Sequence, residues 1–590
     1  MMPAGGAGMR FLRTLCVLVA CGSGLARAGQ ETAPPVTPRQ VAEGHLRRAR
    51  EYGRASCEML REHRRQAVDG YYVSCEEAWN AVWTCPDAAD VLCQAAEVYA
   101  DSLAGLLEAA RCHGRLTAAG LWIGTATKPV LVPWQPKALP IDANAIAGVE
   151  PQAQAADKRI SRRLLRDGFG LPVVVRVAAK RDDMPLRRFA PDRQSIAATA
   201  VLRFRMPGDE TFLQSFAGPV YRDQAAAVLD LANPVEIAAV HIGPARPHLA
   251  ADLTAPLLDM LAGMPKADGI EGFIQPFGRG DTQPRLEILE PHRPGRIPVV
   301  FIHGLASDEG TWFDMLNELR AWPTFHRRFE AWVYHYPTGA SFLQVAAVLR
   351  RELPAAVRAA DPQGSDPALR NLVLVGHSMG GLHAKLQVVE PGTSLWDAIA
   401  DVPFAEIRIR PETRRLVAPG YFFTPLPFVK RVVFIATPHR GSMLAALGVG
   451  RLASLTVRQP PEMRAIHDEA VRLNPGAFHP DYEQRLPTSV DLLRPSSSIL
   501  QAVERLRVPC WVTTHAVVGR AHESLSGGDD CVVPVASAHT PGAVSEIEVP
   551  ASHTRVHHHP LTIAELERIL LQHLHECGVA AEPAPGGPAR

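Results

Sequence analysis

Hydrophobic positions repeat with helical spacing in the first part of the chain. Between about residues 40 and 115, apolar side chains recur every three to five positions and acidic side chains fall between them. The clearest apolar run contains Val91, Ala95, Val98, Leu103, Leu106 and Ala110. Such a stripe covers one face of a helix, so the pattern predicts a small helical domain at 40–120.

The pattern changes between about residues 125 and 290. Segments 171–178 and 197–204 are rich in β-branched and apolar residues, and charged or proline-containing connectors separate them. A short helical run leads toward Leu261, and glycine and proline then accumulate up to Pro294, as in a linker. We therefore expect a mixed α+β domain of unknown role at 125–290.

From residue 298 the chain follows the order strand, loop, helix, strand, sharp turn, helix. Continuous apolar runs at 298–302 and 371–375 are typical of strands buried on both faces of a parallel sheet. Further strands are expected at the start of segment 432–442, at 508–518 and at 546–550, and a closing helix at 563–574. The fold class predicted for 296–578 is α/β, a mostly parallel sheet flanked by helices.

Two insertions interrupt this C-terminal domain, at about 390–430 and 443–507. They contain Trp396, Tyr421, Phe422 and Phe423, together with proline-rich turns. Exposed aromatic side chains in a cap would suit an apolar substrate, whereas buried ones would form an ordinary extra helix layer, and both interpretations stay open. The final residues, 579–590, are expected to be a disordered tail.

The N-terminus indicates export. Arg10 and Arg13 flank an apolar run, 11–20, that is about half the ~20 residues a membrane-spanning helix needs. Residues 1–28 are therefore predicted to be a signal peptide. Segment 18–21 resembles a bacterial lipobox, in which Cys21 is lipidated, and segment 26–28 resembles an ordinary A-x-A cleavage site. The lipobox is preferred, and the protein is expected in the bacterial envelope, either periplasmic or membrane-attached as a lipoprotein through Cys21.

Length and charge limit the class of protein. A chain of 590 residues is too long for one hydrophobic core, so two or three domains are expected. The 62 basic and 61 acidic side chains give a net charge of +1, which removes any electrostatic argument for a nucleic-acid partner. The partner must therefore be inferred from a site.

The ten cysteines bear on the compartment. Two lie in or beside the leader, five lie between residues 57 and 112, and three lie near the C-terminus at Cys510, Cys531 and Cys577. Export favours disulfide bonds, and the absence of any C-x-x-C pair disfavours a zinc ribbon or a thioredoxin-like centre. The alternative is that some cysteines are buried small hydrophobic residues.

The second apolar strand runs directly into Gly376-His377-Ser378-Met379-Gly380-Gly381. This G-x-S-x-G pattern predicts a nucleophile elbow, a strained strand-to-helix turn in which glycines allow strand and helix to approach each other. Ser378 is therefore the candidate nucleophile. An oxyanion formed at its substrate needs two N–H donors, and the expected ones are the amides of Met379 and of Leu305, which follows His303-Gly304 after the first strand.

The remaining catalytic residues are expected beyond Ser378, in the order acid and then histidine. Asp530, in a Gly-rich loop after the strand at 508–518, is preferred over its neighbour Asp529, which is interpreted as a turn former. His553 follows the last strand and is the candidate base. The run 557–559 of three histidines is interpreted as a solvated turn rather than a metal site.

Together these motifs resemble the bacterial lipase and esterase branch of the α/β-hydrolase superfamily, in the manner of GPI inositol-deacylase-like serine hydrolases. The resemblance rests on these motifs: His303-Gly304-Leu305, the Ser378 elbow, segment 432–442, the Asp530 loop and His553. The resemblance implies an α/β-hydrolase fold and hydrolysis of carboxylic esters, on an ester or lipid-like small molecule, without a metal or organic cofactor. In such loops His439 is treated as structural.

The leading hypothesis is thus an exported serine esterase that works through a Ser378–Asp530–His553 triad and an acyl-enzyme. An acyltransferase would use the same triad, with a hydroxyl compound in place of water. The alternative of another class is an envelope interaction protein in which the hydrolase module is secondary. Acyl and alcohol groups, cysteine pairing and oligomeric state stay open.

Overall fold

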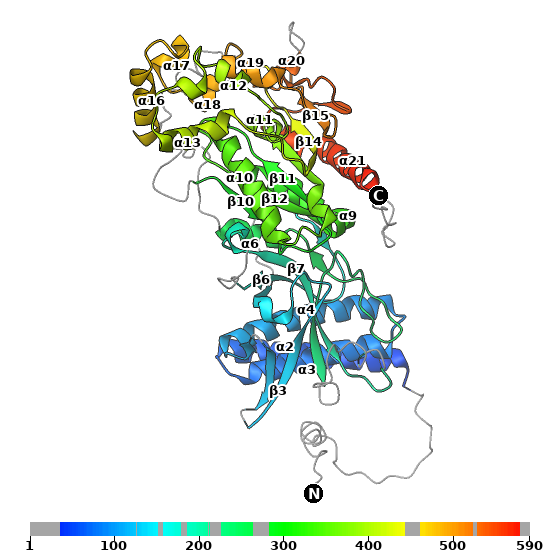
Figure 1. Cartoon of the computed structure of the whole chain (residues 1–590). Helices are drawn as coiled ribbons and strands as arrows, with labels where there is room; N and C mark the ends of the chain where they lie inside the picture. The colour runs from blue at the N-terminus through cyan, green and yellow to red at the C-terminus, as the bar shows by residue number, and fades with distance from the viewer. Residues whose placement is uncertain are drawn as a thin grey trace, which may run out of the picture.

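The structure of the chain is a computed structural model. It describes residues 36–117, 119–125, 127–151, 157, 159–178, 186–209, 212, 226–263, 283–442, 461–522 and 528–578. Figure 1 shows an N-terminal part, blue to cyan, and a C-terminal part, green to red, stacked end to end. The predicted leader with Cys21 and the predicted tail at 579–590 lie outside the described residues. Among the helices in these ranges, none has the length and apolarity needed to cross a bilayer.

The N-terminal part begins with three long helices, α2 (Pro38–Arg61), α3 (Gln66–Thr84) and α4 (Ala89–Cys112). α2 starts at a capping box in which Thr37 and Gln40 satisfy each other's backbone amides, with Pro38 at the first helical position. The apolar stripe of α4 is buried, as its spacing predicts, and includes Val91, Leu103 and Leu106.

These helices cover one face of a seven-stranded sheet with the order β1-β2-β3-β8-β7-β6-β4. Its strands are β1 (Leu116–Thr117), β2 (Gly120–Thr125), β3 (Lys128–Lys137), β4 (Ile146–Pro151), β6 (Leu171–Val177), β7 (Ser195–Phe204) and β8 (Ala227–Ala232). A small second sheet pairs β5 (Leu165–Arg166) with β9 (Ala251–Asp252). Helices and sheet share one hydrophobic core, in which Trp79 of α3 and Tyr99 of α4 pack against Phe169.

The expected disulfide bonds are not found. All eight cysteines in the described part of the chain are free, and Cys75 is fully buried in the core between the three helices. Burial raises the pKa of the Cys75 thiol above its ordinary range. Cys75 thus acts as a small hydrophobic residue, which was the alternative interpretation of the pattern.

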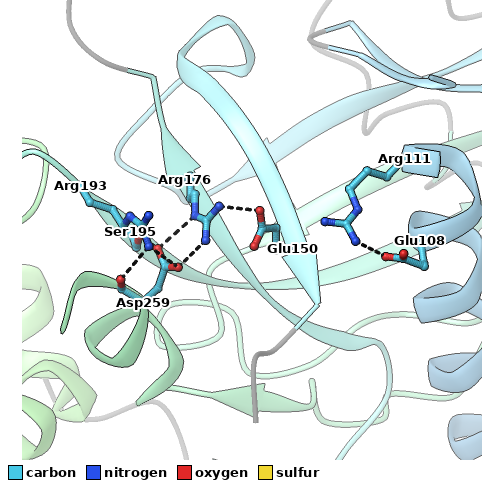
Figure 2. A network of polar contacts seen from close by, with 7 residues as sticks. All are labelled: Glu108, Arg111, Glu150, Arg176, Arg193, Ser195 and Asp259. Atoms are coloured by element: carbon cyan, nitrogen blue, oxygen red, sulfur yellow. Dashed lines mark hydrogen bonds and ion pairs between the residues drawn. The ribbon is translucent and has the colours of Figure 1, made fainter. Parts of the chain in front are cut away.

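Helix α6 (Ala255–Gly263) joins the two parts of the molecule. On one side, Asp259 accepts hydrogen bonds from Arg176 of β6 at 2.6 Å and from Ser195 of β7 at 2.6 Å, and Arg176 also bonds Glu150 of β4 (Figure 2). Burial raises the pKa of Asp259, but these donors outweigh it and hold the pKa below its ordinary value. On the other side, Leu257 lies in the core of the C-terminal part.

The C-terminal part is built on a second seven-stranded sheet, with the order β10-β12-β11-β13-β14-β15-β16. Its strands are β10 (Arg285–Ile288), β11 (Ile297–Ile302), β12 (Phe329–His335), β13 (Leu372–His377), β14 (Val429–Ile435), β15 (Thr513–Gly519) and β16 (Ser545–Val549). Only β10 pairs antiparallel in this sheet, with β12, and the other pairs are parallel. The mixed α/β architecture with a mostly parallel sheet is therefore observed.

Helices cover both faces of this sheet. They are α8 (Phe313–Ala321), α9 (Pro323–Arg328), α10 (Phe342–Ala360), α11 (Met379–Lys385), α20 (Val535–Ala538) and α21 (Pro560–Glu576). Along β11, Val300 and Ile302 pack on the side of α10 and α11, whereas Val299 and Phe301 pack on the side of α8 and α21. Because both faces are buried, the strand has to be apolar at every position, which explains its continuous hydrophobic run.

One predicted strand boundary is wrong. The apolar run at 508–518 forms a strand only from Thr513, because residues before it make a turn in which the Val512 amide donates to the Pro509 carbonyl. Pro509 has no amide hydrogen and cannot contribute a donor to a sheet ladder.

The two insertions lie against each other at the top of Figure 1. They contain α12 (Ser394–Asp397), α13 (Pro411–Tyr421), α16 (Pro461–Leu473), α17 (Pro480–Gln484), α18 (Ser489–Leu492) and α19 (Ser498–Arg505). Trp396 is buried, with its ring 5.3 Å from that of Tyr421, and the Arg350 guanidinium covers the Phe423 ring. These aromatic side chains therefore pack an extra helix layer, and the cavity left among them is only about 50 Å³.

Candidate active site

Ser378 occupies a strained turn between β13 and α11. It caps the N-terminus of α11 with φ 55° and ψ −127°, a left-handed backbone conformation that non-glycine residues seldom adopt. Its amide donates to the Ile435 carbonyl of β14, which fixes the turn against the neighbouring strand. The serine side chain therefore sits at the carboxyl edge of the sheet, at the head of a helix.

The glycines around Ser378 are required by close backbone contacts. A Cβ on Gly376 would lie 2.5 Å from the Gly380 carbonyl oxygen, and one on Gly380 would lie 2.5 Å from the His303 carbonyl oxygen. A Cβ on Gly381 would lie 2.8 Å from the Thr437 Cβ. Each contact is shorter than real Cβ atoms make, so this turn admits only glycine at the three positions.

The structure brings Ser378, His553 and Asp530 into one hydrogen-bonded chain. Ser378 Oγ lies 2.9 Å from His553 Nε2, and His553 Nδ1 lies 2.7 Å from Asp530 Oδ2. The three side chains follow β13, β16 and β15 and are all buried. An ionised carboxylate accepts hydrogen bonds and donates none, so the ring atom that faces Asp530, Nδ1, carries the proton of the neutral histidine. Nε2 is then free to accept the serine proton.

Asp530 is held by the loop that follows β15. Its Oδ1 accepts from the amides of Val532 at 2.9 Å and Val533 at 2.6 Å, which aims Oδ2 at His553. The rival Asp529 instead accepts from the Cys531 amide at 2.8 Å, within its own turn. Of the two neighbours, the structure therefore brings Asp530 to the histidine and leaves Asp529 as a turn former.

The loop after β11 lies directly against the serine. A Cβ on Gly304 would be 2.8 Å from Ser378 Cβ, so Leu305 follows a residue in close contact with Ser378. Met379 is the first residue of α11, where amides have no partner within the helix. His303 does not take part in this chain. Its ring stacks on Tyr336 at 4.2 Å, and its carbonyl accepts from the Tyr336 hydroxyl at 2.6 Å, which shapes the loop.

Two further histidines pack beside His553. His377 Nε2 lies 2.9 Å from the His553 carbonyl oxygen, and the His377 ring lies 4.5 Å from that of His557. Burial, with a contribution from His557, lowers the pKa of His377 well below its ordinary range, so its ring is neutral and donates through Nε2–H. The prediction of a solvated turn is wrong for His557, which is buried, and burial lowers its pKa to about 3. The sequence shows these residues within conspicuous motifs but gives no sign of their contact.

We expect His377→Leu to lower kcat about 10- to 100-fold with little change in KM. The substitution leaves the buried His553 carbonyl without its donor, at a cost of about 1–3 kcal/mol, and loosens His553 where its ring meets Ser378. Steady-state kinetics on an activated ester measures both constants. His377→Gln, which keeps a donor, should recover part of the rate. His383→Leu is the matched control, because that buried ring lies against Tyr336 and Phe342, and an equal loss there would contradict the positioning role.

His439 lies at the end of β14 and is buried. Its Nε2 is 3.2 Å from the Thr540 hydroxyl, and its ring packs edge-on against Phe434. Burial lowers the pKa of His439 to about 3, which keeps the ring neutral. These contacts fit a structural residue of the loop.

No family model matches the chain, and no curated protein matches it. Solved structures are similar to about half of it. They include Bacillus licheniformis lipase BlEst2 in its mature form (16% identity, TM-score 0.31, covering 49% of this chain and 99% of that one). Staphylococcus hyicus lipase has 15% identity and a TM-score of 0.31, covering 49% and 98%. The metagenomic carboxyl esterase MGS0156 has 16% identity and a TM-score of 0.28, covering 54% and 99%. At these scores the likenesses carry no conclusion about what this chain acts on.

Proposed function

We propose that this chain is a serine hydrolase of the α/β-hydrolase type that cleaves carboxylic esters through an acyl-enzyme. The observation that carries the proposal is the unbroken hydrogen-bonded chain from Ser378 Oγ through His553 to Asp530, on a turn whose strained backbone presents the serine. Nucleophile, base and orienting carboxylate within hydrogen-bond reach are the parts that acyl transfer to water requires.

The proposed reaction has two halves. In the first, His553 Nε2 takes the Ser378 proton as Oγ bonds to the ester carbonyl carbon, and the histidine then gives that proton to the departing alkoxide, which leaves as the alcohol. In the second, water gives a proton to His553 and attacks the acyl-enzyme, which releases the acid and returns the proton to Ser378. The amides of Leu305 and Met379 are the proposed oxyanion donors, each worth about 3 kcal/mol.

Export and lipid attachment at Cys21 belong to the same proposal, and their support is the leader sequence alone. A closer relationship to GPI inositol-deacylase-like hydrolases is also part of this proposal, and the motifs around Ser378 support it. The proposed hydrolase domain at 296–578 follows the composition of that segment. The helices expected at 40–120 and the mixed α+β segment at 125–290 share one hydrophobic core, so we propose them as one N-terminal unit.

The test is covalent labelling of the purified full chain with a fluorophosphonate, beside Ser378→Ala. We expect the wild-type chain to be labelled and to hydrolyse short p-nitrophenyl esters, and the variant to do neither, because the probe reacts with an activated serine. Mass spectrometry should find the adduct on the peptide that contains Ser378. A label on another serine, or ester turnover that survives in Ser378→Ala, would overturn the proposal.

A further inference from the structure

A cavity of about 570 Å³ lies beside the C-terminal sheet, away from the Ser378–His553–Asp530 chain. Its walls come from the end of α11, the segment between α19 and β15, the loop after β14 and the turn before β16. Four cationic side chains line it, together with one carboxylate, that of Glu504. The cations are Lys385, Arg440, Arg505 and Arg507.

The single carboxylate, that of Glu504, already forms an ion pair with one of the four cations. Glu504 Oε1 lies 2.6 Å from Arg440 Nε, and the Glu504 backbone carbonyl accepts from Lys385 Nζ at 3.0 Å. Within the part of the chain that the structure describes, no carboxylate forms an ion pair with Lys385, Arg505 or Arg507. The cavity therefore has an excess of about three positive charges, since burial keeps the nearby His439 neutral.

Lys385 is the unusual member of this set, because it is 7% exposed and still faces the cavity. Burying an ammonium is unfavourable, and burial lowers the pKa of Lys385 to about 8 even though the nearby Glu504 carboxylate acts in the opposite direction. An anion bound in the cavity would offset that cost. The threonines Thr513, Thr514 and Thr540, which also line the cavity, offer neutral hydroxyl donors to such an anion.

Two exposed apolar side chains belong to the cavity lining or to a residue adjacent to it in sequence. Val544 lines the cavity and is 62% exposed, and Trp511, which lies between the lining residues Cys510 and Val512, is 49% exposed. An exposed indole beside basic side chains is the arrangement that proteins use where an anionic headgroup meets apolar chains. The cationic side chains of the lining and the exposed Val544 and Trp511 together fit one molecule with an anionic end and an apolar end.

We propose that this cavity binds a phosphate group, with the apolar portion of the phosphorylated molecule lying against Trp511 and Val544. Arginine matches the tetrahedral anion through paired donors, and lysine binds it as a point charge, so Arg505, Arg507 and Lys385 form a suitable set. The lining does not include Ser378, Asp530 or His553, so we expect Ser378→Ala to leave phosphate binding unchanged.

Cys510 reports on occupancy in the full-length protein. It lines the cavity and is exposed, so iodoacetamide, which is uncharged, should alkylate it. We expect inorganic phosphate, at ionic strength held constant with chloride, to slow alkylation of Cys510 at least fivefold and to leave that of the exposed Cys112 unchanged. Peptide mass spectrometry measures both thiols in one sample. Lys385→Met should abolish the protection, and Arg507→Ala, at an exposed position, should weaken it.

Vesicles distinguish a lipid headgroup from a soluble phosphate compound. We expect the wild-type chain to sediment with phosphatidylcholine vesicles that contain about 30% phosphatidic acid at least fivefold more strongly than with phosphatidylcholine alone. Lys385→Met and Trp511→Ala should each reduce that binding at least fivefold, and the exposed Arg358→Ala is the control that should not. Protection of Cys510 without vesicle binding would exclude a lipid headgroup and leave a soluble phosphate compound as the ligand, and no protection by phosphate in the wild-type chain would overturn the site.

Discussion

Replacing Asp530 with asparagine should lower kcat about 10,000-fold and leave the fold intact. The amides of Val532 and Val533 hold Oδ1 of this side chain, so the oxygen of the asparagine will stay with them and its NH₂ group will face His553. That group donates to Nδ1 and forces the ring proton onto Nε2, where it blocks acceptance of the Ser378 proton. Steady-state hydrolysis of an activated ester measures the loss, and circular dichroism checks the fold.

Asp529→Asn is the matched control, since it makes the same change in the adjacent carboxylate. Among the described residues, the Asp529 carboxylate accepts from the Cys531 amide within its own turn, so we expect kcat to change by no more than about twofold. If Asp530→Asn kept more than a tenth of the wild-type kcat, or if Asp529→Asn lost the activity instead, Asp530 would not be the residue that orients the base.

Local sequence signals predicted much of the C-terminal part. The apolar runs at β11 and β13 mark strands that have to be hydrophobic at every position, because helices cover both faces. The glycines beside Ser378 mark a turn with no room for a Cβ. Both signals act within a few residues, so they can be seen without knowing the fold. Asp530 and His553 could be chosen because each follows a strand and the chain order is fixed in this class of turn.

The remaining features depend on contacts between distant segments. His377 and His557 are separated by 180 positions, and their rings meet only because β13 and the end of β16 reach the same edge of the sheet. The number of cysteines in an exported chain suggested that Cys75 forms a disulfide bond. The packing of three helices makes it a core residue instead. The cavity at Lys385 also joins segments more than a hundred residues apart, so no local pattern could have indicated it.

Long-range contacts also explain why the sequence alone did not indicate the role of α6. Its short helical run is visible in the sequence, but its role follows from contacts on two sides. Asp259 bonds Arg176 and Ser195 of the N-terminal sheet (Figure 2). Leu257 lies in the core of the C-terminal part. The carboxylate and the apolar side chains serve different parts of the molecule. We infer that the N-terminal and C-terminal parts are held together through this helix.

Gly380→Ala should destabilise the C-terminal part by about 3 kcal/mol or more, at the upper end of the usual cost of overpacking. The added methyl group would press on the backbone carbonyls of Ile302 and His303, and backbone cannot rotate away as a side chain can. The same displacement would shift α11 and with it the Met379 amide and Ser378. Urea unfolding followed by tryptophan fluorescence measures the change in unfolding free energy, and fluorophosphonate labelling should fall with it.

The control for this substitution is Gly420→Ala, another glycine within a helix. Its added Cβ would lie 3.8 Å from the nearest atoms, which is ordinary van der Waals contact, and alanine favours a helix over glycine by about 1 kcal/mol. We therefore expect Gly420→Ala to leave stability unchanged or slightly raised, and labelling at the wild-type level. If both variants lost stability equally, the loss would reflect a general intolerance of this part to substitution. If Gly380→Ala were as stable and as reactive as wild type, the close packing of α11 on β11 would be refuted as the reason for that glycine.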